Sequence, residues 1–211
     1  RLDTLAGFFA LGLVPTGSRD PYALRRAALA VVRILLEGGL KLNLPAAIAA
    51  ARGLHEVEGA SAEEVTASLH PFLLERLRFL LERRGFRHDE IESVLTTECP
   101  DVTDAAERVA AVAAVRKQPD FGPLALAFKR VQNILTQAGA SGPGEVDPAL
   151  VTEDAERQLA GDFYQAKGIL DELIGGRRYE EALSVMASLG PSLDRFFTEV
   201  MVLVEDSAVR A

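Results

Sequence analysis

The chain has 211 residues, 48% of them apolar, a composition typical of a folded protein with one large domain or two small ones around a buried core. Its formal net charge is -8, and its single cysteine, Cys99, excludes an intramolecular disulfide. No apolar run approaches the roughly 18 residues of a membrane helix and no signal peptide is visible, so we expect a cytoplasmic protein without a membrane partner.

The opening residues indicate a fragment. The chain begins at Arg1, without a methionine, and residues 2–13 already show helical periodicity. We therefore expect sequence upstream of Arg1 in the parent protein.

The first 44 residues predict two helices and carry a local basic excess. After residues 2–13, a loop with Pro15 and Gly17 leads to Asp20-Pro21, a pair typical of a helix start. The second helix ends at Gly38-Gly39. Its apolar stripe is Leu24, Ala28, Val31, Val32 and Leu35. Residues 1–44 hold six Lys/Arg against three Asp/Glu, whereas the rest of the chain is acidic.

Residues 45–119 predict a helical subdomain. We expect a helix over 46–55, a second opened by the capping-box pattern Ser61-x-x-Glu64, and a third after Asp101. Pro71 lies inside the second and predicts a kink or a restart near His70. The core stripe of that helix is Val65, Leu69, Leu73, Leu77 and Leu80.

Four more helices are expected after Pro119. The first follows Gly122-Pro123, and the others cover about 152–174, 178–189 and 192–208. The last is apolar almost all round between residues 196 and 204, which is typical of a buried helix. In the first, the expected core face is Leu124, Phe128, Val131 and Leu135, and the opposite face carries Lys129, Gln132, Asn133 and Thr136.

The sequence offers little for catalysis. Three histidines are scattered along the chain, and no His-Glu-x-x-His, paired Cys-x-x-Cys, Walker or Gly-x-Ser-x-Gly motif occurs. His88-Asp89 resembles part of a metal-dependent phosphohydrolase signature, but such a site needs further ligands that the sequence does not offer. We therefore expect no catalytic residue and no metal site.

Several cations are compatible with RNA binding. Lysine and arginine neutralise phosphates, arginine also stacks on bases, and amides read base edges. On spacing alone a solvated helix face is the better explanation of the cluster at Lys129, and the other cations are equally unspecific. The candidates are Lys129, Arg130, Gln132, Asn133, Arg177, Arg178, Arg19, Arg25 and Arg26.

Four ordered motifs resemble the β subunit of bacterial heterotetrameric glycyl-tRNA synthetase. The first covers residues 2–9 (LDTLAGFF) and 15–29 (PTGSRDPYALRRAAL), and the second is Lys129-Arg130-Val131-x-Asn133-Ile134. The third is Tyr179-x-x-Ala182-Leu183. The fourth closes the chain with Phe196-Phe197-x-x-Val200-Met201-Val202-x-Val204-Glu205-Asp206.

This resemblance implies an all-α fold in three parts. Residues 1–44 would be the C-terminal helices of an HD-like domain, 45–105 a helical connector, and 106–211 an α-helical, DALR-like anticodon-binding domain truncated at its C-terminal end. It also implies a non-catalytic, tRNA-binding fragment with no cofactor of its own. The α subunit of an α2β2 assembly would use ATP with Mg to aminoacylate tRNA(Gly).

Glycine anticodons end in two cytosines, which call for a hydrogen-bond acceptor beside a cationic or amide donor. The alternative to RNA binding is a helical module that contacts another subunit and no RNA, consistent with the net charge of -8. A metal-dependent hydrolase is a distant third possibility.

Overall fold

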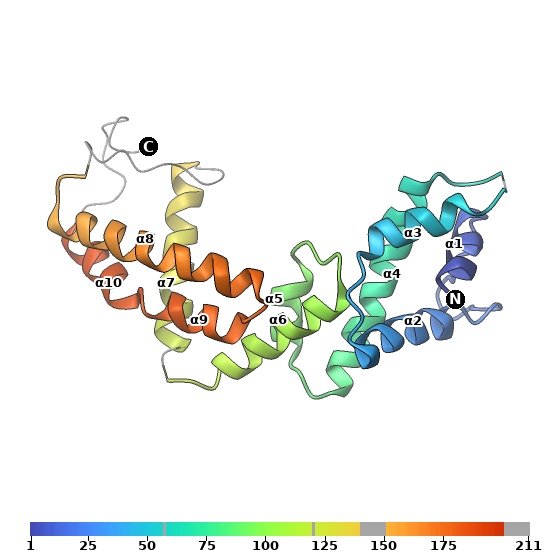
Figure 1. The fold of residues 1–211 in the computed structure, drawn as a ribbon, viewed down its shortest axis with the longest axis horizontal. Helices are drawn as coiled ribbons and strands as arrows, with labels where there is room; N and C mark the ends of the chain where they lie inside the picture. The colour runs from blue at the N-terminus through green and yellow to red at the C-terminus, as the bar shows by residue number, and fades with distance from the viewer. Residues whose placement is uncertain (57, 120, 140–150, 201–211) are drawn as a thin grey trace. The chain divides into compact units, whose positions relative to one another are not determined.

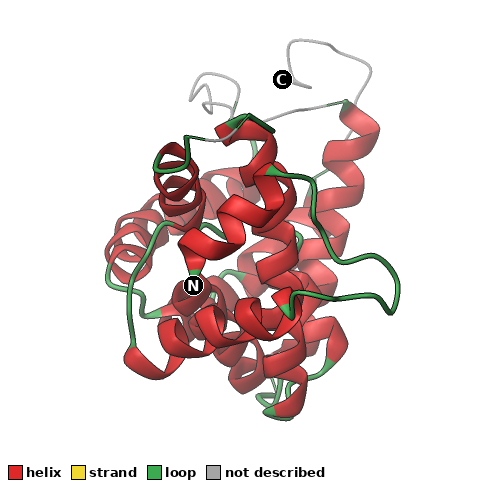
Figure 2. Cartoon of the chain, turned by 90° about the vertical axis from the view of Figure 1, so that its right-hand side faces the viewer, coloured by secondary structure: helices red, strands yellow, loops and turns green. Residues whose placement is uncertain are grey.

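The computed structural model describes residues 1–56, 58–119, 121–139 and 151–200. Within these ranges the chain forms ten α-helices and no strand, so the expected all-α fold class is confirmed (Figures 1 and 2). The helices are α1 (Leu2–Ala10), α2 (Leu24–Gly38), α3 (Leu44–Gly53), α4 (Ala62–Arg83), α5 (His88–Leu95), α6 (Val102–Val115), α7 (Phe121–Ala138), α8 (Asp154–Gly175), α9 (Tyr179–Ala187) and α10 (Gly190–Glu199).

The chain divides into two compact units. Unit 1 spans Arg1–Ala113 and unit 2 spans Ala114–Ala211. The finer division at 44/45 and 105/106 stays a prediction.

Helix α4 is the centre of unit 1. It packs against α1, α2, α3 and α5 (Figure 1). The expected stripe of α4 is confirmed, because Val65, Leu69, Leu73, Leu77 and Leu80 are all buried. The five apolar stripe residues predicted for α2 are buried as well. Burial of an aliphatic side chain contributes about 1.5–3 kcal/mol each, so these two stripes account for much of the stability of unit 1.

Local capping sets where α4 begins. The Glu64 amide donates to Ser61 Oγ at 3.2 Å, and the Ser61 amide donates to Glu64 Oε2 at 2.8 Å. Both halves of the predicted capping box are therefore present. Helix α4 runs without interruption through Pro71, so a restart near His70 was wrong.

The start of α2 differs from the prediction. The expected helix start at Asp20-Pro21 was three residues early, because Pro21 lies in a turn and α2 begins at Leu24. The Asp20 carboxylate still caps the helix, accepting from the amides of Leu24 at 2.8 Å and Arg25 at 3.0 Å. Ala23, directly before the helix, takes a left-handed conformation with φ of 55°. The left-handed backbone at Ala23 turns the chain so that the amides of Leu24 and Arg25 point toward the Asp20 carboxylate.

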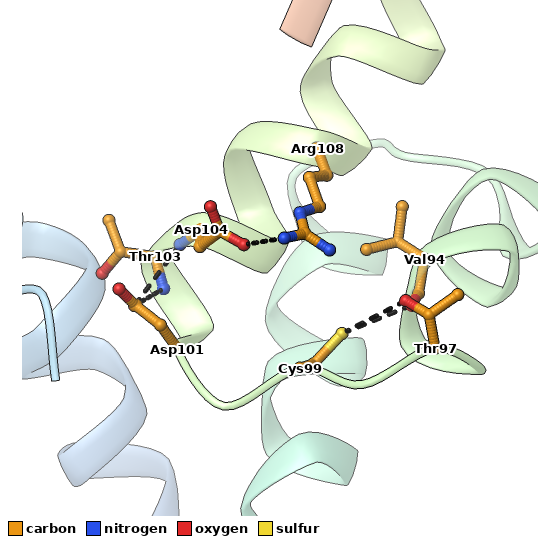
Figure 3. A network of polar contacts seen from close by, with 7 residues as sticks. All are labelled: Val94, Thr97, Cys99, Asp101, Thr103, Asp104 and Arg108. Carbon is orange, nitrogen blue, oxygen red and sulfur yellow. Dashed lines mark hydrogen bonds and ion pairs between the residues drawn. The ribbon is translucent and has the colours of Figure 1, made fainter. Parts of the chain in front are cut away.

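The end of α5, the loop that follows it and the start of α6, residues 94–108, form a polar junction (Figure 3). The Asp101 carboxylate accepts from the amide of Thr103 at 2.8 Å, which caps α6 as the sequence predicted. The Cys99 thiol donates to the Val94 carbonyl at 3.3 Å. Two further bonds tie this junction to the rest of unit 1: the Thr103 hydroxyl donates to the Leu40 carbonyl at 3.0 Å, and a ring nitrogen of His70 lies 2.9 Å from the Cys99 carbonyl.

Unit 2 is built from α8 paired with α9 and α10, with α7 contacting α9 and α10. The predicted core face of α7 was partly wrong. Leu124 is buried, but Phe128 and Leu135 are 47% and 46% exposed, and Ala127 is buried instead. After Phe121, which is half-buried, the buried and half-buried positions are Leu124, Ala127, Val131 and Ile134. The contact stripe is therefore rotated relative to the prediction, toward α9 and α10, which pack against this helix.

The closing helix is shorter than expected. Helix α10 begins at Gly190, so Gly190-Pro191 opens this helix instead of ending the one before it. It ends at Glu199, and Val200 is extended with φ of -105° and ψ of 130°. A β-branched residue fits an extended backbone better than a helix, which explains the end of the helix there. The remainder of the predicted helix, residues 201–208, lies outside the described residues.

Candidate nucleic-acid interface

Helix α7 presents a polar face to solvent. Lys129, Gln132 and Asn133 are all exposed on it. Residues 129 and 133 are four apart and 132 is three from 129, so the three side chains lie on one side of the helix. One ammonium and two amides on a single face can contact phosphates and read base edges.

Arg130 has a structural role that its sequence context does not indicate. Its guanidinium carbon lies 4.2 Å from the centre of the Phe197 ring, and its Nη2 donates to the Phe197 carbonyl at 3.2 Å. Arg130 therefore joins α7 to α10. Its exposed position leaves the remaining donors of the guanidinium accessible to a ligand.

Arg177 and Arg178 occupy the turn between α8 and α9. Arg177 adopts the left-handed conformation, with φ of 57°, at a position where glycine is the usual residue. Arg178 donates from its side chain to both carboxylate oxygens of Glu181 in the first turn of α9. This bond holds the pKa of the Glu181 carboxyl below its ordinary value. The ion pair offsets the unfavourable placement of a cation at a helix start, so Arg178 has a structural explanation independent of RNA.

The three candidate arginines near the start of the chain belong to unit 1. The Arg25 side chain donates to the Gly17 carbonyl at 2.6 Å and so holds the loop before α2. Arg19 and Arg26 are exposed. The structure thus places the nine candidates in three groups: the α7 face, the α8–α9 turn, and the start of α2.

A polar hollow in unit 2 was not predicted from the sequence. It has a volume of about 390 Å³ and lies where the first turn of α7 meets the end of α9 and the start of α10. Asp194, Ser184 and Ser188 contribute its polar groups. The Ser184 hydroxyl donates to the Glu180 carbonyl at 3.0 Å, and the Ser188 hydroxyl donates to the Val185 carbonyl at 2.7 Å. Because their hydrogens are used in these bonds, both hydroxyl oxygens can act only as acceptors toward a ligand. No local sequence motif marks this hollow, because its residues come from three helices.

An apolar cavity of about 490 Å³ lies elsewhere in unit 2. Helices α7, α8, α9 and α10 all contribute to it, through side chains such as Phe128, Phe163, Met186 and Phe196. Apart from Glu156 and Tyr164 its lining is apolar, and the Glu156 carboxylate accepts from the amides of Thr152 and Glu153, so the cavity suits an apolar side chain.

Two other kinds of feature, a metal site and a membrane-spanning helix, are absent from the described residues. Among the described residues, no group of three or more His, Cys, Asp or Glu side chains is arranged to hold a metal ion. No helix in the described ranges is long and apolar enough to cross a membrane.

Comparisons with known proteins match both units. A family described as "Glycyl-tRNA synthetase beta subunit" matches residues 1–96, and one described as "DALR anticodon binding domain" matches residues 124–211. Glycine–tRNA ligase β subunits align with the whole chain. The one from Acidobacterium capsulatum is 43% identical over 220 residues, covering 100% of this chain and 31% of the relative. The chain belongs to the glycyl-tRNA synthetase β-subunit family.

Two further β subunits agree with this assignment. The relative from Leptothrix cholodnii is 40% identical, with all of this chain aligned to 29% of its length. The relative from Pseudomonas aeruginosa is 41% identical, with all of this chain aligned to 31% of its length. The chain thus spans about 30% of the length of the relatives that it matches. The α7 face, the α8–α9 turn and, except for Pro123, the polar hollow lie in the region matched by the anticodon-binding family.

Proposed function

We propose that this chain is a tRNA-binding part of a glycine–tRNA ligase, and that unit 2 recognises tRNA(Gly) through its anticodon. The match of residues 124–211 to an anticodon-binding family carries this proposal. In the same proposal, the chain itself is non-catalytic. A glycyl-tRNA synthetase α subunit, in a cytoplasmic α2β2 assembly, performs the aminoacylation with ATP and Mg.

The α7 face supplies the donors for this recognition. Lys129 contacts a phosphate, and Gln132 and Asn133 hydrogen-bond to base edges. Arg130, at the border of this face, packs on the Phe197 ring and so connects α7 to α10.

The polar hollow supplies the acceptor that a cytosine requires. The amino group of cytosine is a donor, and a carboxylate is a suitable partner for it. Asp194, beside the acceptor hydroxyls of Ser184 and Ser188, is the carboxylate of this hollow. This arrangement accounts for base recognition by a unit with an acidic net charge.

Two substitutions separate phosphate contact from base reading. Binding of tRNA(Gly) to the full chain is measured by fluorescence anisotropy between 50 and 200 mM salt. Lys129→Gln should weaken binding and reduce the salt slope by roughly one unit or slightly less, for any tRNA. Asp194→Asn should leave the slope unchanged and reduce the preference for tRNA(Gly) over a tRNA whose anticodon lacks the cytosines.

A matched control is Asp171→Asn, which makes the same charge change at an exposed position on α8. If Lys129→Gln and Asp194→Asn bind tRNA(Gly) like the unaltered chain, these residues are not the interface. Absence of any tRNA binding by the unaltered chain would contradict the proposed function as a whole.

The apolar cavity favours a second candidate function, a module that contacts another subunit. An apolar side chain from a partner would fill the cavity among α7 to α10. Binding of the α subunit by the chain, with no measurable tRNA affinity, would select this function over anticodon recognition.

A further inference from the structure

Three arginines from two separate helices line one hollow of unit 1. The hollow has a volume of about 250 Å³ and lies between the C-terminal ends of α2 and α4. Arg33 contributes from α2, and Arg83 and Arg84 contribute from the end of α4. We call it the arginine hollow. Its other lining residues are Glu37 and Leu80.

The hollow has an excess of positive charge. Glu37 is the only acid among its lining residues, and it pairs with Arg33 at 3.5 Å. The Arg83 guanidinium lies 5.7 Å from the centre of the Phe79 ring. Neither Arg83 nor Arg84 is held in an ion pair by any residue that the structure describes. Both guanidinium groups therefore keep donors for an anionic ligand.

Helix capping explains only part of this cluster. Cations at the end of α4 are favoured by the helix dipole, which accounts for Arg83 and Arg84 singly. The dipole of α4 does not explain why Arg33, which belongs to α2, lies in the same hollow. A hollow lined mainly by one sign of charge concentrates ligands of the opposite sign.

The row of cations continues beyond the hollow along α2. Arg26 precedes Arg33 by seven residues, which places the two on one face of the helix, about 10 Å apart along its axis. Both are exposed. A row of this length fits successive phosphates of a polymer better than it fits one small anion.

We propose that the arginine hollow, with Arg26 beside it, binds backbone phosphates of the tRNA. This inference rests on the proposed function, but it concerns unit 1 and a different kind of contact. Guanidinium groups match phosphate oxygens in a bidentate geometry. The contact positions the RNA and is independent of base sequence.

The test is a triple substitution, R33Q/R83Q/R84Q, in the full chain. Anisotropy titrations with tRNA(Gly) and with a tRNA of another anticodon are carried out across the same salt series. We expect at least a tenfold loss of affinity at low salt and a salt slope lower by roughly two to three units, equally for both RNAs. The charge-conserving R33K/R83K/R84K should keep most of the slope.

The matched control is R1Q/R157Q/K167Q, which removes the same charge from exposed positions outside the hollow. Circular dichroism checks that each variant keeps its helices. An unchanged slope in R33Q/R83Q/R84Q, with the unaltered chain still binding, would overturn the phosphate contact and leave the proposed function standing. An equal loss in the control, or a loss confined to tRNA(Gly), would also overturn it. If the unaltered chain binds no tRNA, both proposals fail.

Discussion

Arg130 of α7 lies over the ring of Phe197 in α10, with its guanidinium carbon 4.2 Å from the ring centre. The same side chain donates to the Phe197 carbonyl at 3.2 Å. A cation that the sequence suggests as an RNA contact is thus also a link between two helices. The two roles separate experimentally, because the structural one does not depend on RNA.

Removing this link should destabilise unit 2. We expect Arg130→Ala to lower the free energy of unfolding by about 1 kcal/mol, since an exposed cation–π contact contributes roughly 0.5–1 kcal/mol and the hydrogen bond adds to it. Urea denaturation measures the change. A double-mutant cycle with Phe197→Leu isolates the ring contact, because the carbonyl acceptor remains. A coupling energy near zero would show that the stacked geometry contributes nothing.

Gly59 should not tolerate a side chain. A Cβ at this position would lie 2.2 Å from the carbonyl oxygen of Ala10, which itself accepts from the Ala60 amide at 2.9 Å. We expect Gly59→Ala to destabilise unit 1 by about 1–3 kcal/mol, the usual range for overpacking. Gly53→Ala is the control, since a Cβ there meets nothing within 4 Å. Thermal unfolding should separate the two variants clearly, and similar melting temperatures would refute the clash.

Ala23 should be improved by glycine. Its φ of 55° is unfavourable for a residue with a Cβ, by roughly 1 kcal/mol. We expect Ala23→Gly to raise the free energy of unfolding by about 0.5–1 kcal/mol. Ala27→Gly, one turn into α2, should lower it by about 1 kcal/mol. Opposite signs in the same denaturation assay test the backbone conformation, and two losses would contradict it.

Cys99 should lose reactivity on folding. Its side chain is 3% exposed, and burial raises the pKa of the thiol above its ordinary value of 9.0, outweighing the opposing effects of Thr97 and Arg108. The thiolate is the reactive form, so alkylation in the folded chain should be much slower than in urea. A rate equal to that of the unfolded chain would place the thiol at the surface.

The same shift predicts a pH dependence of stability. A raised pKa means that the folded state favours the neutral thiol, so this contribution is complete below pH 9.0 and falls as the pH rises past it. The Cys99→Ala variant has no thiol to ionise at this position. The difference in unfolding free energy between Cys99→Ala and the unaltered chain should therefore change only above about pH 9, as measured by urea denaturation at successive pH values.

The sequence predicted the elements whose signals are local. The stripes of α2 and α4 were correct because the helical periodicity of their apolar residues is unbroken, even though α2 begins three residues later than expected. Helix α5 was missed because it has eight residues and begins with the polar run His88-Asp89-Glu90. The end of α10 was misplaced because a helix was preferred for the valine-rich run after Phe197, whereas Val200 is extended.

The candidate interface was predictable only in part. The exposed face of Lys129, Gln132 and Asn133 follows from helical spacing alone. The contact of Arg130 with Phe197 joins residues 67 positions apart, and the arginine hollow joins α2 to the end of α4. Such contacts depend on how helices pack, which composition and spacing do not determine.

The apolar cavity of unit 2 affects how the stability of the chain varies with temperature. The heat capacity of unfolding scales with the apolar surface that unfolding newly exposes to water. Phe163, which borders the cavity, is already 46% exposed in the folded chain, so unfolding newly exposes less of its apolar surface. Unit 2 should therefore have a flatter stability curve than unit 1, and a ligand that fills the cavity should make that curve steeper.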